Sequence, residues 1–172
     1  SGELDLRLGV LEREGRLIAG QYTARSRPQL VADGSRAILT MLRGNTWLLS
    51  MADWELGLAG DLPWRLLLSS YLGEIDADLR GLIVDEAIIA SGFGNIHVVG
   101  PDSPAGPIAV RSTLGDITLN IPEHMAASVT VNGSAFFGVK LLSNRLEETG
   151  TNSYQTINYA DADDPLIITV TG

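Results

Sequence analysis

Apolar residues in the middle of this chain recur every 21 positions and keep that register over several repeats. One column joins Trp54, Ile75, Ile96 and Ile117. Three further columns hold Trp47, Leu68, Ile89, Val110 and Val131; Leu56, Ala77, Val98 and Leu119; and Leu66, Ala87, Ile108 and Val129. A period of about 20–30 residues is typical of solenoids, in which each repeat buries its apolar face against its neighbours.

Within each repeat the apolar and polar residues alternate with a period of two. Residues 73–79 alternate between apolar and acidic side chains, and residues 94–98 and 115–121 are equivalent segments. Such alternation predicts strands with one buried and one solvated face. Each segment begins with a glycine, where a bend or a positive φ is tolerated. A second short strand precedes each glycine, at residues 66–68, 87–89, 108–110 and 129–131.

Two strands per repeat predict an all-β fold, either a short β-solenoid or a two-sheet sandwich of stacked 21-residue coils. We expect a single domain over residues 1–172, with N-terminal strands or a cap at 1–45, a repeat core at 46–141, and a loop and last strand at 142–172. The predicted strands outside the core cover residues 2–6, 17–22, 37–42 and 166–170. The abrupt start and end of the chain suggest a fragment of a longer protein.

The register changes near the end of the repeats. Val139 and Leu141 match the earlier inward positions only if one residue is inserted, so we expect a bulge or a longer turn around Ser134. The segment 142–158 is polar and predicts a long loop or terminal cap.

Composition excludes several classes of protein. The chain has no cysteine, so disulfides and thiolate chemistry are ruled out. No stretch approaches the roughly 20 apolar residues that a transmembrane helix needs. The net charge is −9, with seven basic and five acidic residues in 1–45 but five basic and sixteen acidic residues in 46–172. This acidic body disfavours nucleic acid and anionic lipid as partners. The absence of cysteine fits either side of a membrane and leaves the compartment open.

The two histidines are the first candidates for chemistry. His97 takes the outward position that Asp76 and Thr118 occupy in the neighbouring repeats, and His124 follows Pro122-Glu123 in a turn. A metal site needs three or four converging ligands, and the column around His97 supplies two good ones at most. We therefore expect both histidines to be surface residues, with no metal and no cofactor.

A column of polar residues gives the sharpest alternative. Glu74, Asn95 and Asp116 stack on the outward face beside the His97 column. Paired carboxylates on such a face are the usual machinery of glycoside hydrolysis, which also needs a groove and aromatic side chains for the sugar. An ordinary solvated face explains the same column without catalysis, and we assign no catalytic residue.

Two shorter motifs resemble a dinucleotide-binding fingerprint and a calcium-binding loop, but neither matches its pattern. Gly92-Phe93-Gly94 begins like a dinucleotide fingerprint, but its third glycine position is His97 and a strand follows instead of a helix. The acidic run 161–164 lacks the glycine and the later glutamate of a calcium loop. It predicts an acidic turn before the last strand.

The repeated strands that begin with Gly73, Gly94 and Gly115, and the segment 118–123, resemble the soluble C-terminal domain of LiaF-type proteins. These are cell-wall-active antibiotic response proteins, whose domain is often called a toastrack, and related bacterial adhesin-like domains share the pattern. The resemblance covers residues 47–141. It implies a β-stacked domain, commonly joined to membrane segments, that binds other proteins in envelope-stress signalling. It implies no catalytic residues.

The sequence therefore favours a non-enzymatic binding or regulatory domain with a protein partner, held through a rigid surface or an exposed strand edge. That partner could be a membrane regulator or a second copy of the chain. A carbohydrate-binding or carbohydrate-cleaving β-helix is the alternative. A long polar groove with two carboxylates about 5–10 Å apart would favour the alternative.

The columns make a direct prediction about stability. Ile96→Asp should unfold the protein, because it places an unpaired charge in a shared core column, whereas His97→Ala on the neighbouring outward position should leave the fold intact. Thermal melts of the two variants test this. The reverse ranking would show that the inward and outward assignments are exchanged.

Overall fold

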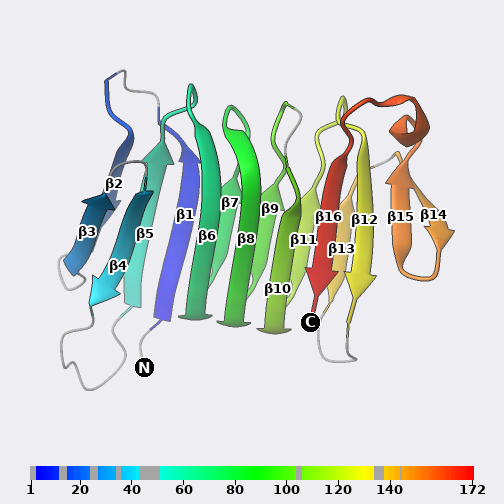
Figure 1. Ribbon diagram of the computed structural model, residues 1–172. Helices are drawn as coiled ribbons and strands as arrows, with labels where there is room; N and C mark the ends of the chain where they lie inside the picture. The colour runs from blue at the N-terminus through cyan, green and yellow to red at the C-terminus, as the bar shows by residue number, and fades with distance from the viewer. Residues whose placement is uncertain are drawn as a thin grey trace.

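Figure 1 shows two β-sheets stacked face to face, with strands that lie side by side from one end of the molecule to the other. The computed structural model describes residues 3–11, 15–23, 27–33, 36–42, 51–103, 106–133, 138–143 and 145–172. The elements are β1 Glu3–Val10, β2 Ile18–Tyr22, β3 Arg27–Asp33, β4 Arg36–Leu42, β5 Met51–Leu58, β6 Pro63–Leu72, β7 Ile75–Asp78, β8 Ile83–Phe93, β9 Ile96–Val99, β10 Ile108–Leu114, β11 Ile117–Asn120, β12 Ala127–Asn132, β13 Val139–Leu142, β14 Leu146–Gly150, β15 Ser153–Thr156, the 3-10 helix η1 Tyr159–Asp161, and β16 Leu166–Thr171.

The first sheet has the strand order β13-β11-β9-β7-β1-β5-β2, and the second sheet has the order β14-β15-β12-β16-β10-β8-β6. The repeat strands are parallel within each sheet, and each coil crosses from the second sheet to the first through a short turn. Antiparallel strands occur at the outer parts, where β2 pairs with β5 and β15 pairs with β12. A separate antiparallel hairpin joins β3 and β4. The prediction of an all-β, two-sheet stack of coils is confirmed.

The predicted 21-residue columns form the core. Ile75, Ile96 and Ile117 are in register on β7, β9 and β11, and all three side chains are fully buried. Val139 and Leu141 continue these columns opposite Ile117 and Leu119, as the inserted residue predicts. Burying each such aliphatic side chain stabilises the fold by roughly 1.5–3 kcal/mol.

The columns are interrupted at two places by strands from outside the repeats, and this corrects the sequence prediction. Leu6 of β1 lies between Trp54 and Ile75, in register with both. Val170 of β16 lies in the same way between Val110 and Val131. A period in the sequence determines which face a residue occupies. It does not determine which strand is the lateral neighbour, so strands from either end of the chain can enter a column whose apolar positions they match.

The segment after β13 is a second correction. The long loop is wrong, because β14 and β15 form an antiparallel hairpin; this hairpin lies on the edge of the second sheet, where the alternative, a terminal cap, would lie. The apolar alternation of this hairpin is weak, because only a few of its side chains, mainly Leu146 and Tyr154, pack against the core. Thr156 is buried, and its hydroxyl oxygen accepts a hydrogen bond from the backbone N–H of Ala127 at 2.9 Å.

Other sequence predictions have mixed outcomes. The strands predicted at 17–22, 37–42 and 166–170 are present as β2, β4 and β16, whereas β3 was not predicted. Trp47 and the predicted bulge around Ser134 lie outside the described residues. No described segment forms a helix of the length and hydropathy that a membrane span requires.

The turns between the two sheets generate a stability prediction. Gly94 has φ +139°, and a Cβ atom on it would lie 2.1 Å from the carbonyl oxygen of Gly73 in the next coil. Gly94→Ala should therefore cost at least about 2 kcal/mol of unfolding free energy, from backbone strain and the clash together. Urea denaturation measures this cost.

Gly9→Ala is the matched control, because nothing lies within 4 Å of a Cβ atom added there. Its effect should stay within about 0.5 kcal/mol. Equal losses in the two variants would contradict the close approach at the turn.

Candidate binding surface

The polar column predicted on the outward face lies in the turns just before β7, β9 and β11, where it forms a hydrogen-bonded ladder. The backbone N–H of Glu74 donates to Oδ1 of Asp5 at 2.9 Å, and Nδ2 of Asn95 donates to Oε1 of Glu74 at 3.1 Å. The backbone N–H of Asp116 donates to Oδ1 of Asn95 at 3.0 Å. These hydrogen bonds connect successive turns. Glu74 and Asp116 therefore contribute to the fold through them.

The second column also lies where the sequence places it. Asp76, His97 and Thr118 are in register on the outer face of the first sheet, and His97 is exposed. Within the described ranges, no three His, Cys, Asp or Glu side chains gather closely enough to hold a metal ion.

The remaining candidates lie apart from this column. The exposed His124 ring has its Nε2 at 2.8 Å from the carbonyl oxygen of Asp102. The acidic run 161–164 starts in η1 and forms the turn before β16. Gly92 lies on β8, and Gly94 lies in the turn that leads to β9. The structure therefore does not bring these residues together.

One carboxyl group has a shifted pKa. The guanidinium of Arg80 holds the pKa of Asp78 below its ordinary value, chiefly through side-chain hydrogen bonds, one of them from Nε to Oδ1 at 2.9 Å. Partial burial of Asp78 opposes this shift, and the backbone N–H of Arg80 adds a further hydrogen bond. A general acid needs a raised pKa, so this pair is suited to holding a turn and not to donating a proton.

The outer faces of the two sheets differ in charge. Strands β1, β5 and β7 of the first sheet present the acidic residues Asp5, Asp53, Glu55, Asp76 and Asp78. The second sheet carries the exposed charged residues Arg65 on β6 and Asp85 and Glu86 on β8. A second set of outward residues on this sheet has no acidic member: Leu67, Ser69 and Tyr71 on β6; Ile88, Ala90 and Gly92 on β8; Ala109, Arg111 and Thr113 on β10; Ile167, Thr169 and Thr171 on β16; and Ser128, Thr130 and Asn132 on β12. We call this second set the acid-free face. Its single charged residue is Arg111.

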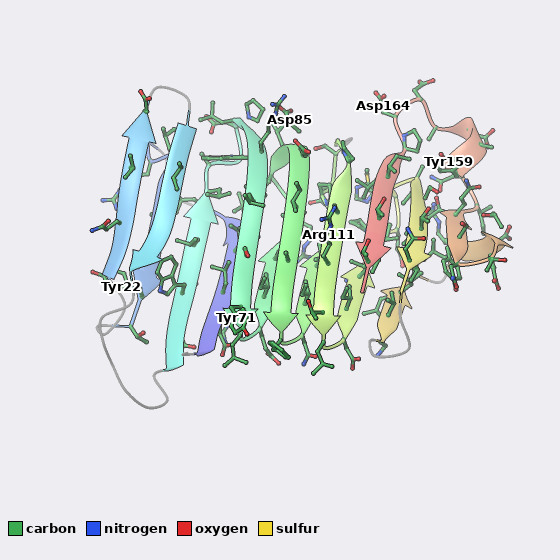
Figure 2. The ribbon with its side chains drawn as sticks, turned by 60° about the horizontal axis from the view of Figure 1, so that its bottom comes forward. Tyr22, Tyr71, Asp85, Arg111, Tyr159 and Asp164 are labelled. Carbon is green, nitrogen blue, oxygen red and sulfur yellow. The ribbon has the colours of Figure 1, made fainter. Side chains whose placement is uncertain are left out.

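A shallow groove of about 720 Å³ crosses the lower part of the acid-free face. Figure 2 shows Tyr71 at the lower end of β6 and Arg111 near the middle of β10, both on the face toward the viewer. Ser69, Ala90 and Gly92 line the groove together with these two residues, and their small side chains leave its floor open.

Gly92 is needed at this floor. A Cβ atom on Gly92 would lie 3.4 Å from Cδ2 of Tyr71 and 2.7 Å from its carbonyl oxygen. The Tyr71 ring therefore lies close to a strand position without a side chain, which is one reason for glycine in the interior of a strand.

Aromatic and aliphatic side chains border the lower end of the groove. Tyr71 is 70% exposed and packs edge-to-face on Phe93, with 5.7 Å between ring centroids. Leu72, Phe93 and Leu114 occupy equivalent positions before the three turns, and all are exposed. Contiguous exposed apolar surface of this kind marks interaction sites more often than isolated exposed residues do.

The polar columns that follow the glycines do not indicate this face. A signal was available in the strands before them. The outward positions of 67–71, 88–92 and 109–113 carry no acidic residue, although the chain as a whole has a net charge of −9.

Comparisons with known proteins identify the fold. No family model matches the chain, and no curated protein matches its sequence. The structure is similar to the crystal structure of a protein from Clostridium sporogenes ATCC 15579 described as a "putative cell adhesion protein", with a TM-score of 0.74 and 16% sequence identity. The match covers 99% of this chain and 87% of that chain. At this identity, the comparison shows that the two proteins share a fold.

The Asp78–Arg80 pair generates a pH prediction. Because the pKa of Asp78 is held below 3.8, the pair stabilises the folded state above that pH, and the contribution is lost as the pH falls through the folded-state pKa. Arg80→Gln should raise the pKa of Asp78, and NMR titration of its carboxyl carbon measures the change.

Arg65→Gln is the control, because Arg65 makes no contact with Asp78 among the described interactions. It should leave the titration of Asp78 unchanged. The same pKa for Asp78 with and without Arg80 would show that the ion pair does not form in solution.

Proposed function

We propose that this chain is a non-catalytic binding domain that holds a protein partner against its acid-free face, in a bacterial envelope-stress or membrane-associated signalling system. The observation that carries the proposal is the groove beside Tyr71, with exposed apolar residues at its border and no aspartate or glutamate side chain in its lining. Aromatic residues and arginine are enriched in the energetically important parts of protein interfaces.

The stacked core supports this proposal. The acid-free face lies on five hydrogen-bonded strands whose inward side chains are buried, so its outward residues are held on a rigid platform. A preformed surface loses little conformational entropy when it binds. The similarity of fold to a protein described as a cell adhesion protein also fits a domain that binds.

Carbohydrate binding is a second candidate, because the groove combines an aromatic ring with the hydroxyl groups of Ser69 and Thr113. Cleavage of a glycan is less well supported. The two carboxylates considered for it, Glu74 and Asp116, lie at the turns and contribute to the ladder, and neither lines the groove.

Photo-crosslinking tests the proposal. A photoreactive side chain at Thr113, on the acid-free face, should form covalent adducts with a protein in membranes of the source bacterium. The same group at His97, exposed on the outer face of the first sheet, is the matched control. Mass spectrometry identifies the adducts.

We expect a specific protein adduct at Thr113 that is absent at His97, and that is lost when Tyr71→Ser is added. Adducts of equal yield at both positions would contradict a binding surface on the second sheet. Retention on insoluble cell-wall polysaccharide, without any protein adduct, would replace the protein partner by a glycan.

A further inference from the structure

We infer that the groove takes an extended peptide segment of the partner that carries an acidic side chain and a large apolar side chain four residues apart. This inference rests on the proposed function and specifies the chemistry of the partner. Arg111 would receive the acidic side chain, and the surface formed by Tyr71 and Phe93 would receive the apolar one.

The charge of the groove selects the acidic group. Arg111 is exposed and makes no ion pair or hydrogen bond with any residue that the structure describes. No acidic side chain lines the groove to compete for it. Guanidinium groups bind carboxylates through two parallel hydrogen bonds, so the unpaired Arg111 is suited to a partner's aspartate or glutamate.

The net charge of the chain does not oppose this assignment. The acidic residues of the first sheet lie on the opposite side of the sandwich, and stacked sheets are about 10 Å apart before their side chains are counted. On the second sheet, the exposed Glu86 lies four residues along β8 from Ala90, the neighbour of Arg111, a separation of about 13 Å. The Debye length at physiological ionic strength is about 8 Å. Solvent ions therefore screen much of the repulsion between the far face and a ligand at Arg111.

The strand register determines the spacing. Ser69, Ala90 and Arg111 lie in one row across β6, β8 and β10, and Tyr71 lies two residues beyond Ser69. With neighbouring strands about 4.8 Å apart and a rise of about 3.3 Å per residue, Tyr71 and Arg111 are separated by roughly 12 Å along the face. Residues four apart in an extended peptide are on the same side and span about 13 Å.

The border of the groove favours a peptide over a sugar. Tyr71 lies beside the exposed Leu72 and Phe93, and Leu67 on the same strand is 74% exposed. An apolar side chain that covers this surface removes it from water on both partners. A glycan would place hydroxyl groups against the same surface, where apolar neighbours leave them without hydrogen-bond partners.

An NMR titration of the isotope-labelled chain tests the inference, because it detects weak binding and locates it by residue. The probe is an eight-residue synthetic peptide with one leucine and one glutamate four positions apart, separated by serine and threonine. Two control peptides replace the glutamate by lysine or shorten the spacing to three, which places the two side chains on opposite sides. The amide signals also show whether each protein variant is folded.

We expect the probe to shift amides of 69–71, 90–92 and 111–113, and to bind at least about tenfold more tightly than either control peptide. Arg111→Gln should weaken binding by about tenfold, consistent with the loss of a charged hydrogen bond, and Arg111→Lys should restore part of it. Arg65→Gln removes a positive charge from β6, outside the lining of the groove, and should have no effect on binding.

Two results would overturn the inference. Equal shifts with all three peptides, or none, would reject the acidic and apolar pattern. The Thr113 crosslink does not depend on this probe. The crosslinking experiment would therefore still test the proposed function after the peptide pattern had been rejected. An Arg111-dependent titration by oligogalacturonate, with weaker binding of the peptide, would assign the groove to an acidic glycan.

Discussion

The structure depends on lateral pairing of parallel strands that keeps like positions of successive coils side by side. Inward residues in one row are of like character: Ile75, Ile96 and Ile117 form an apolar row, and the buried Ser70, Ser91 and Ser112 form a row of small hydroxyl side chains. The same pairing aligns outward residues in rows. A polar row can then form bonds from coil to coil, as Asn95 does with Glu74 and Asp116. The groove follows from this constraint as well, because it needs small outward residues at matching positions on neighbouring strands.

The alternation and the 21-residue period predict much of the core. Ile96 and His97 are adjacent in sequence and occupy the inner and outer faces as expected, because a strand presents successive side chains on opposite sides. The position of β1 beside β7 was not predictable in this way. Leu6 pairs with Ile75 across a large sequence separation. Any strand with the same alternation could place an apolar side chain at this position of the row. The β14–β15 hairpin escaped prediction because an edge hairpin buries few residues and shows little apolar periodicity.

The candidate surface was harder to predict than the core. A binding face depends on which outward residues become neighbours, and this requires the register of several strands. Arg111 and Tyr71 are 40 positions apart in sequence, yet they line one groove because β6, β8 and β10 are adjacent. Carboxylates gather on β1, β5 and β7 of the first sheet, whereas the acid-free face of the second sheet has none, although Glu86 lies on the same sheet beyond it.

The insertion of β1 and β16 has a consequence for how the protein is made and how it can change. In a simple solenoid, coils can be added or lost by duplication because each contacts only its sequence neighbours. Here β10 and β12 acquire their shared partner only after the ribosome has produced residues 166–171. Until then both strands have an unpaired edge in the second sheet, a state that exposes them to incorrect pairing. A coil added or lost beside β1 or β16 would separate that strand from a partner, whereas the coil of β8 and β9 has only repeat strands as neighbours. The two inserted strands therefore limit where along the stack the number of coils can change.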